Sequence, residues 1–185
     1  MATRAERLSR EDWITKALDT LSEQGLGAIR VEPLARALGV TKGSFYWHFA
    51  DHQALLDAMI ESWLRSSRER MTIVANHDPD PAKRLHFLLH VVSEGGCARF
   101  DLAVRAWAMH DGSVLQRALE LDRERFAMVT GMFREMGFSE LDARTRTRIV
   151  SANILGDQAI IETNTDEERR HTVETIFKMV TARPA

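Results

Sequence analysis

The chain has 185 residues, a length that suits one compact protein of one or two small domains, and its 44% hydrophobic content is enough for a buried core. The single cysteine, Cys97, excludes an intrachain disulfide, and no apolar run approaches the ~20 residues needed to span a bilayer. The N-terminal segment lacks the apolar core of a signal peptide. We therefore expect a soluble cytoplasmic protein with no membrane partner.

The net charge of −2 is divided unevenly along the chain. Residues 1–50 hold 7 Lys and Arg against 6 Asp and Glu, whereas residues 51–185 hold 18 against 21. The N-terminal part is thus only mildly basic, so its cations must lie on one face if they are to attract phosphates. Dimerisation would double the number of such contacts.

Three short helices are predicted within residues 1–50. Ser9 suits the N-cap of the first helix, whose apolar residues follow at helical spacing until a glycine ends it. Pro33 suits the first turn of the second helix, and Thr41 suits the N-cap of the third. Strand-like alternation is absent from the sequence. We therefore expect an all-α protein that begins with a three-helix bundle.

Six further helices are predicted after this bundle. The first starts at Asp51, runs to about residue 75 and connects the bundle to the next domain, and residues 76–81 then form a polar break with two prolines. The remaining helices are expected before Gly95 and over residues 100–109, 114–136, 140–163 and 166–181. The sequence thus predicts about nine helices, with one domain over residues 1–50 and another over residues 51–185.

The most informative pattern lies between the second and third helices. An amphipathic segment ends at Leu38, and only Gly39 and Val40 separate it from the helix start at Thr41. Two short helices joined by a tight turn that contains glycine are the layout of a helix-turn-helix, whose second helix meets base edges in the major groove. Donors and aromatic side chains are dense in that helix: Thr41, Lys42, Ser44, Tyr46, Trp47 and His48.

This stretch resembles the DNA-binding domain of TetR-family transcriptional regulators. The resemblance rests on Leu34-Ala35, on the run from Leu38 to Phe49 and on Ala54-Leu55-Leu56. The rest of the chain matches the family only in length, helical pattern and order of parts. The resemblance implies a homodimeric, ligand-responsive regulator, a repressor that a small molecule releases from a palindromic DNA operator.

The candidate DNA contacts lie in and around the third helix. Lys42 can meet a phosphate or a guanine edge, Ser44 is small enough for close approach, and Gly43 lets the helix sit near the DNA. The resemblance implies phosphate contacts for Tyr46 and His48. The full set of candidates is Arg30, Thr41, Lys42, Gly43, Ser44, Tyr46, Trp47, His48 and His52.

Several of these residues also have a plainer interpretation. Lys42 and Arg30 are otherwise solvated surface charges, and Trp47 is otherwise an exposed aromatic without energetic weight. His52 stands where the resembling sequences commonly carry a lysine that meets a phosphate. Its alternative is a side chain that simply faces solvent.

The resemblance also implies a small-molecule effector in the second domain. Soft and aromatic side chains inside a helical bundle make a plausible pocket, although plain core packing is the alternative for each of them. The candidates are Trp63, Phe87, His90, Phe100, Trp107, Met109, His110, Met128 and Met132.

The last two helices are predicted to form the dimer interface, because a monomer would leave their apolar faces exposed. Two helices from each subunit would make a four-helix bundle. The candidate interface residues are Ile154, Ile161, Val173, Ile176, Phe177 and Val180.

His86 and His90 are four residues apart on one predicted helix, which is a metal-ligand spacing. No acidic residue stands between them as in a metalloprotease motif, so we expect two partly buried histidines and predict neither a metal nor a cofactor. The sequence also lacks a Gly-rich phosphate loop, a Gly-x-Ser-x-Gly elbow and a Cys-x-x-Cys pair, and it is not expected to be an enzyme. The alternatives that stay open are an effector-independent DNA-binding protein and a small helical metal-dependent enzyme.

Overall fold

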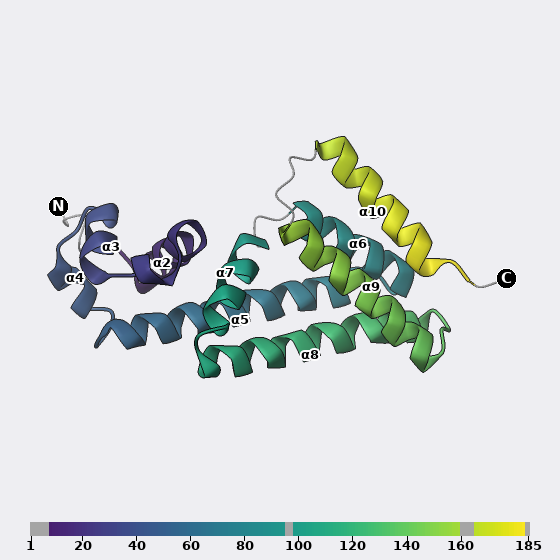
Figure 1. Cartoon of the computed structure of the whole chain (residues 1–185), viewed down its shortest axis with the longest axis horizontal. Coiled ribbons are helices and arrows are strands. Elements are labelled where there is room, and N and C mark those ends of the chain that lie inside the picture. Colours follow the sequence, from purple (N-terminus) through teal and green to yellow (C-terminus); the bar gives the residue numbers. More distant parts are fainter. Residues whose placement is uncertain (1–7, 95–97, 160–164, 184–185) are drawn as a thin grey trace. The chain divides into compact units, whose positions relative to one another are not determined.

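The structure, a computed structural model, describes residues 8–94, 98–159 and 165–183 (Figure 1). Over these ranges the chain forms α-helices and one 3-10 turn, and no strand. The elements are α2 (Arg10–Gln24), η1 (Leu26–Ala28), α3 (Val31–Leu38), α4 (Lys42–Tyr46), α5 (His52–Ala75), α6 (Pro81–Glu94), α7 (Ala98–Ala108), α8 (Gly112–Glu135), α9 (Glu140–Ala159) and α10 (Asp166–Thr181). The prediction of an all-α fold is confirmed. No helix in these ranges combines the length and hydropathy of a membrane span.

Local side-chain signals set the starts of several helices. At α2, Ser9 accepts a hydrogen bond from the backbone N–H of Asp12, and the Asp12 carboxylate accepts one from the backbone N–H of Ser9. Thr165 and Glu168 make the same reciprocal pair at the start of α10. These capping boxes satisfy N–H groups that a helix start otherwise leaves without partners.

The described chain divides into two compact units. The first comprises Met1–Ser66 and Arg99–Ala118, and the second comprises Ser67–Ala98 and Leu119–Ala185. Helix α7 therefore groups with α2–α4, although the sequence placed everything after residue 50 in one domain. Because the division cuts α5 and α8 within their length, the domain boundary after residue 50 stays a prediction.

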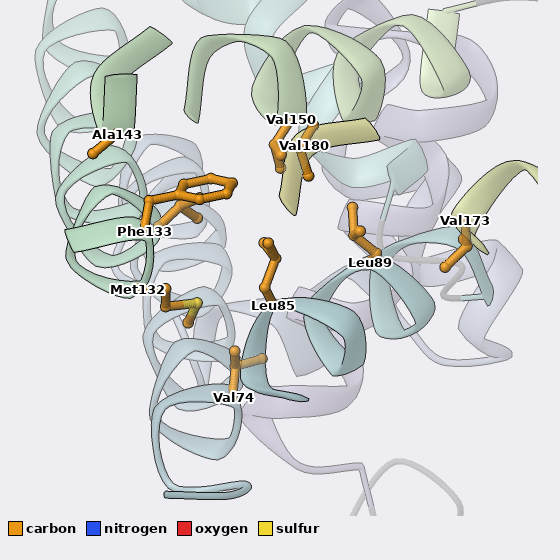
Figure 2. Close-up of a cluster of buried hydrophobic side chains, with 10 residues drawn as sticks. Val74, Leu85, Leu89, Met132, Phe133, Ala143, Val150, Val173 and Val180 are labelled. Carbon is orange, nitrogen blue, oxygen red and sulfur yellow. The ribbon is translucent and has the colours of Figure 1, made fainter. Parts of the chain in front are cut away.

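The core of the second unit brings together side chains from α5, α6, α8, α9 and α10 (Figure 2). Leu85 and Phe133 are fully buried in it. Thr130 and Thr147 are buried polar neighbours, with 3.1 Å between their hydroxyl oxygens, and Thr147 also donates to the carbonyl oxygen of Ala143. A buried hydroxyl without a partner would be costly, so this pair lets two polar side chains share the interior.

The structure corrects the prediction for two residues of the dimer interface. Val173 and Val180 are 5% and 2% exposed, and both belong to the core of the second unit. The apolar face of α10 is thus needed to close the protomer's own core, and these two side chains are not available to a partner. Other predicted interface residues are partly buried against the same core: Ile154, Ile176 and Phe177. Ile161 lies outside the described residues.

Candidate nucleic-acid interface

A tight turn fixes α4 relative to α3. Gly39 has a φ of 72° and a ψ of 33°, the left-handed conformation that glycine adopts at little cost. Its N–H donates to the carbonyl of Arg36 at 3.1 Å, and the N–H of Val40 donates to the carbonyl of Ala35 at 2.9 Å. These bonds satisfy the last carbonyls of α3 and end the helix. Thr41 then stands at the N-cap of α4, as predicted.

The inner face of α4 is held by aromatic packing. Phe45 is fully buried, meets Trp13 of α2 edge-on with 5.4 Å between ring centroids, and stacks on Phe49 at 5.2 Å. The guanidinium of Arg10 lies 4.9 Å from the centroid of the Phe49 ring. Offset and edge-on ring contacts of this kind stabilise a small core beyond the area that they bury. The short helix is therefore anchored by one side chain, and its other face is left for the solvent.

The predicted DNA contacts fall mainly on this outer face. Trp47 is 89% exposed and Tyr46 is 54% exposed. Thr41, Lys42 and Gly43 are also exposed, and His48 is partly buried. Ser44 is different, because it is only 9% exposed. Its burial leaves little surface for the close approach to a base or backbone that the sequence suggested, and Ser44 is withdrawn from the candidate contacts.

Lys42 forms an ion pair that the sequence analysis missed. Its Nζ lies 2.9 Å from Oε1 of Glu32, which stands on α3, and both side chains are exposed. The hydrogen bond from Lys42, followed by its charge, lowers the pKa of the Glu32 carboxyl, and the same bond raises the pKa of Lys42. Exposed pairs are weak and are screened by salt, so a phosphate can take the place of the carboxylate.

His52 and Arg30 each make a hydrogen bond within the fold. Nε2 of His52 donates to the carbonyl oxygen of Ile29 at 2.7 Å, since a carbonyl can only accept. Nδ1 of a neutral His52 is then an acceptor, so the ring can donate to a phosphate only when it is protonated. Nε of Arg30 donates to the carbonyl of Gly27 at 3.2 Å, and the side chain of Arg30 is exposed.

The candidate effector-binding side chains are divided between the two units. Those in the first unit are Trp63, Phe100, Trp107, Met109 and His110, and those in the second are Phe87, His90, Met128 and Met132. Met109 is 80% exposed and His110 is also exposed. Both lie in the turn that follows the end of α7 at Ala108. The prediction that they line a buried pocket is therefore corrected.

Within the first unit, two of the candidate tryptophans are buried. Trp63 and Trp107 are each 4% exposed, and Nε1 of Trp63 donates to Oδ1 of Asp101 at 2.6 Å. Asp101 is itself only 9% exposed. A buried carboxylate is costly unless it accepts hydrogen bonds, and the indole N–H supplies one of them.

A small open groove lies in the second unit, between α6, α9 and α10. Its lining combines apolar and polar side chains: Leu89, Val92, Ser93, Asn153, Ile154, Arg169, Thr172 and Val173. None of the predicted effector-binding side chains belongs to this lining. Two residues predicted for the dimer interface, Ile154 and Val173, line the groove instead.

Comparison with known proteins places the first unit's helix-turn-helix in a recognised family. Residues 14–59 match the family described as "Bacterial regulatory proteins, tetR family". The class C tetracycline repressor protein of Escherichia coli is 38% identical over 66 residues, which are 36% of this chain and 30% of the relative. The class G repressor of Vibrio anguillarum is 35% identical over 72 residues, which are 39% of this chain and 34% of the relative. These alignments span about a third of each relative's length.

Solved structures share the fold over nearly the whole chain. A transcriptional regulator from Rhodococcus sp. Rha1 has a TM-score of 0.75 at 19% identity, and the match covers 96% of this chain and 100% of that one. The ketosteroid transcriptional regulator KstR2 of Mycobacterium tuberculosis has a TM-score of 0.74 at 16% identity, with 95% and 94% covered. At these identities the likeness shows a common fold. The turn at Gly39 and all of α4 fall within residues 14–59, the part of the chain that matches the tetR family of bacterial regulatory proteins.

Proposed function

We propose that this protein is a DNA-binding transcriptional regulator that a small molecule releases from a palindromic operator. The observation that carries the proposal is the outer face of α4. Lys42 and Tyr46 are exposed there on a helix that Phe45 anchors from the inside, and the exposed Trp47 follows directly at the C-cap. In a helix-turn-helix this face enters the major groove, where cations and donors meet phosphates and base edges.

We propose further that the protein acts as a homodimer through α9 and α10. Since Val173 and Val180 are used in the protomer's core, the surface for a partner consists of the apolar side chains that these helices expose. Ile149 is 47% exposed, Leu155 37% and Met179 65%. Two copies would present two α4 helices to two half-sites, and for that reason the operator should be a near-palindrome.

The proposed effector is a small molecule that binds among helices outside the DNA-contacting ones. Trp63, Phe100 and Trp107 remain candidates, because they lie in one compact unit and two of them are buried. An effector lowers operator affinity only if it binds the DNA-free conformation more tightly than the DNA-bound one. A thermal-shift screen of small apolar molecules, with tryptophan emission as a second readout, would identify such a ligand.

Selection of binding sites from a pool of random duplexes tests the DNA-binding function. Repeated rounds with the tag-free protein should converge on a near-palindrome. Binding to the selected duplex should weaken steeply with salt, because Lys and Arg that neutralise phosphates release counterions. Fluorescence anisotropy over a range of salt concentrations measures both the affinity and the slope.

Two substitutions on the outer face of α4 complete the test. Lys42→Ala and Tyr46→Ala should each weaken operator binding strongly, and circular dichroism should show unchanged helicity because both side chains are exposed. If selection yields no common sequence, or if both variants bind as the wild type does, the assignment of α4 as the reading helix is wrong.

A further inference from the structure

The two histidines that the sequence singled out on α6 meet an acidic residue that the sequence could not pair with them. His86 and His90 face Glu174 of α10, and all three lie in the second compact unit. Nε2 of His86 is 2.6 Å from Oε1 of Glu174, and Nε2 of His90 is 3.6 Å from the same oxygen. Two imidazole nitrogens therefore converge on one carboxylate oxygen.

This geometry is close to that of a metal centre. One ligand atom from each of the three residues lies within 4.8 Å of the other two. A tetrahedral zinc ion with ligand bonds of about 2.0–2.1 Å places its ligand atoms roughly 3.3 Å apart. The His90–Glu174 distance is near that value, and the His86–Glu174 distance must open by less than about 1 Å, which a rotation of the carboxylate can provide.

The three side chains are held on ordered elements yet remain open to solvent. His86 contacts His90 edge-on with 4.6 Å between ring centroids, and it contacts Phe177 edge-on at 4.9 Å. The neighbouring Leu85 and Leu89 are buried in the core, so α6 has a fixed rotation beneath the two rings. The side chains of His86, His90 and Glu174 are 36%, 26% and 44% exposed, which lets an ion and a water molecule enter.

We propose that His86, His90 and Glu174 bind a divalent transition-metal ion of the zinc class and link α6 to α10 through it. Two imidazoles and one carboxylate suit zinc and its neighbours, whereas magnesium and calcium prefer all-oxygen sites. Three protein ligands leave the fourth position of a tetrahedral ion for water or for an outside ligand. In the competing interpretation the same residues form only a hydrogen-bonded bridge between the two helices.

Metal titration of the tag-free protein separates these interpretations. All proteins carry Cys97→Ser, since the chain's single thiol would otherwise compete for the ion. After chelator treatment and dialysis, Co²⁺ is added while visible absorption is recorded, and Zn²⁺ is then added to displace it. The expected result is saturation at one ion per protomer, with the absorption bands of low-coordinate Co²⁺ and their loss on addition of Zn²⁺.

Three single variants test the ligand set. His86→Gln, His90→Gln and Glu174→Gln should each weaken Zn²⁺ affinity by more than the about 10–100-fold that loss of an outer-shell partner costs. His110→Gln serves as the matched control, because His110 is exposed and lies in the first unit. Zn²⁺ should also raise the Tm of the wild type and of His110→Gln but not that of the three ligand variants.

Two results would overturn the proposal. One is Co²⁺ binding that fails to saturate at one ion per protomer, and the other is a Zn²⁺ affinity in the three variants equal to that of His110→Gln. Glu174→Gln keeps a hydrogen-bond acceptor for His86, so a loss of metal binding in this variant with unchanged helicity is not a folding defect. The readout does not involve DNA, and either result leaves the proposed regulatory function untouched.

Discussion

The positive charge of Lys42, which we propose contacts DNA, is already paired with another side chain of the same protein. Its ammonium is paired with Glu32 at 2.9 Å, and both groups are exposed. A phosphate that approaches Lys42 must displace this carboxylate and is also repelled by it. In the proposed contact with an operator, Glu32 would therefore oppose binding in two ways, so we expect the ion pair to tune affinity rather than to stabilise the fold.

Replacing Glu32 tests this interpretation. Glu32→Gln should tighten operator binding several-fold and steepen its salt dependence, because Lys42 then contributes a full counterion release. Anisotropy titrations at several salt concentrations measure both effects. Glu23→Gln is the control, since Glu23 is an exposed acidic residue of α2 in the same unit. Equal gains from the two substitutions would mean that only the overall charge matters and that Lys42 makes no direct contact.

Gly43 is a glycine that the fold does not require. Its backbone lacks the left-handed conformation, and an added Cβ would meet only Oγ1 of Thr41, at an ordinary contact distance of 3.6 Å. Glycine inside a helix costs roughly 0.5–1 kcal/mol relative to alanine. A residue that costs stability without serving the fold is best explained by close approach to a partner on the exposed side of α4.

Gly43→Ala should therefore separate stability from binding. We expect the free energy of unfolding to rise by up to about 0.5–1 kcal/mol, because alanine is the better helix former. Operator affinity should fall, since the new methyl group lies where the DNA approaches. Urea unfolding and anisotropy measure the two quantities. Gly131→Ala, in α8, would place its Cβ with no neighbour within 4 Å and should stabilise the protein without weakening DNA binding. Unchanged operator affinity in Gly43→Ala would argue against close approach at this position.

The exposure of the side chains at α4 was predictable from the sequence, whereas the residues with which they form hydrogen bonds and ion pairs were not. The exposed Lys42, Tyr46 and Trp47 follow from their positions in a recognisable motif. The bonds from Lys42 to Glu32 and from His52 to the carbonyl of Ile29 cross between elements 10 and 23 residues apart. Periodicity along one helix holds no information on such pairs, because they depend on how the helices pack against one another.

At the scale of helices, the residue at which a helix starts was more predictable from the sequence than the surface against which its apolar face packs. Ser9 and Thr41 each stand at the N-cap of a helix, as their residue types predicted, and Ser9 also makes the side-chain cap hydrogen bond that Thr41 does not make. The local sequence does not show which surface the apolar face of a helix packs against. The stripe on α10 suits both a protomer core and a dimer interface, and only the structure shows that Val173 and Val180 serve the core.

The two capping boxes predict a pH dependence of stability. Hydrogen bonds from Ser9 lower the pKa of Asp12, and hydrogen bonds from Thr165 lower the pKa of Glu168. A carboxyl with a lower pKa in the folded state binds fewer protons there than in the unfolded chain. Its contribution to stability is therefore present above the unfolded pKa and is lost as the pH falls through the lowered folded value.

Asp12→Asn and Ser9→Ala should both reduce stability near neutral pH and flatten its fall toward acid. Asp12→Asn removes the titrating group, whereas Ser9→Ala removes the hydroxyl hydrogen bond, the largest cause of the lowered pKa of Asp12, and keeps the bond from the backbone N–H of residue 9. Urea unfolding at a series of pH values from about 6 down to 3 covers the window in which carboxyl groups of this kind titrate. A wild-type pH profile in both variants would show that the box at α2 contributes nothing measurable.

At the scale of the whole molecule, binding to a palindromic operator requires two copies of the chain. The exposed side chains of α9 and α10 are the proposed contact between these two protomers. The protomer's own core does not use Ile149 or Met179, which are 47% and 65% exposed. This distinction guides the choice of variant. A charge at Val180 would damage the core and could not distinguish unfolding from dissociation, whereas a charge at an exposed position costs the protomer little.

Ile149→Asp and Met179→Asp should therefore give folded monomers. Burying a carboxylate in an apolar contact between protomers is unfavourable, and a monomer that can hold only one half-site should lose most of its operator affinity. Sedimentation velocity measures the association state, and circular dichroism measures helicity. Ile73→Asp is the matched control, because Ile73 is 59% exposed on α5, outside the proposed contact. If both variants remain dimers while Ile73→Asp dissociates, the partner binds at α5, and the operator geometry has to be rebuilt around that surface.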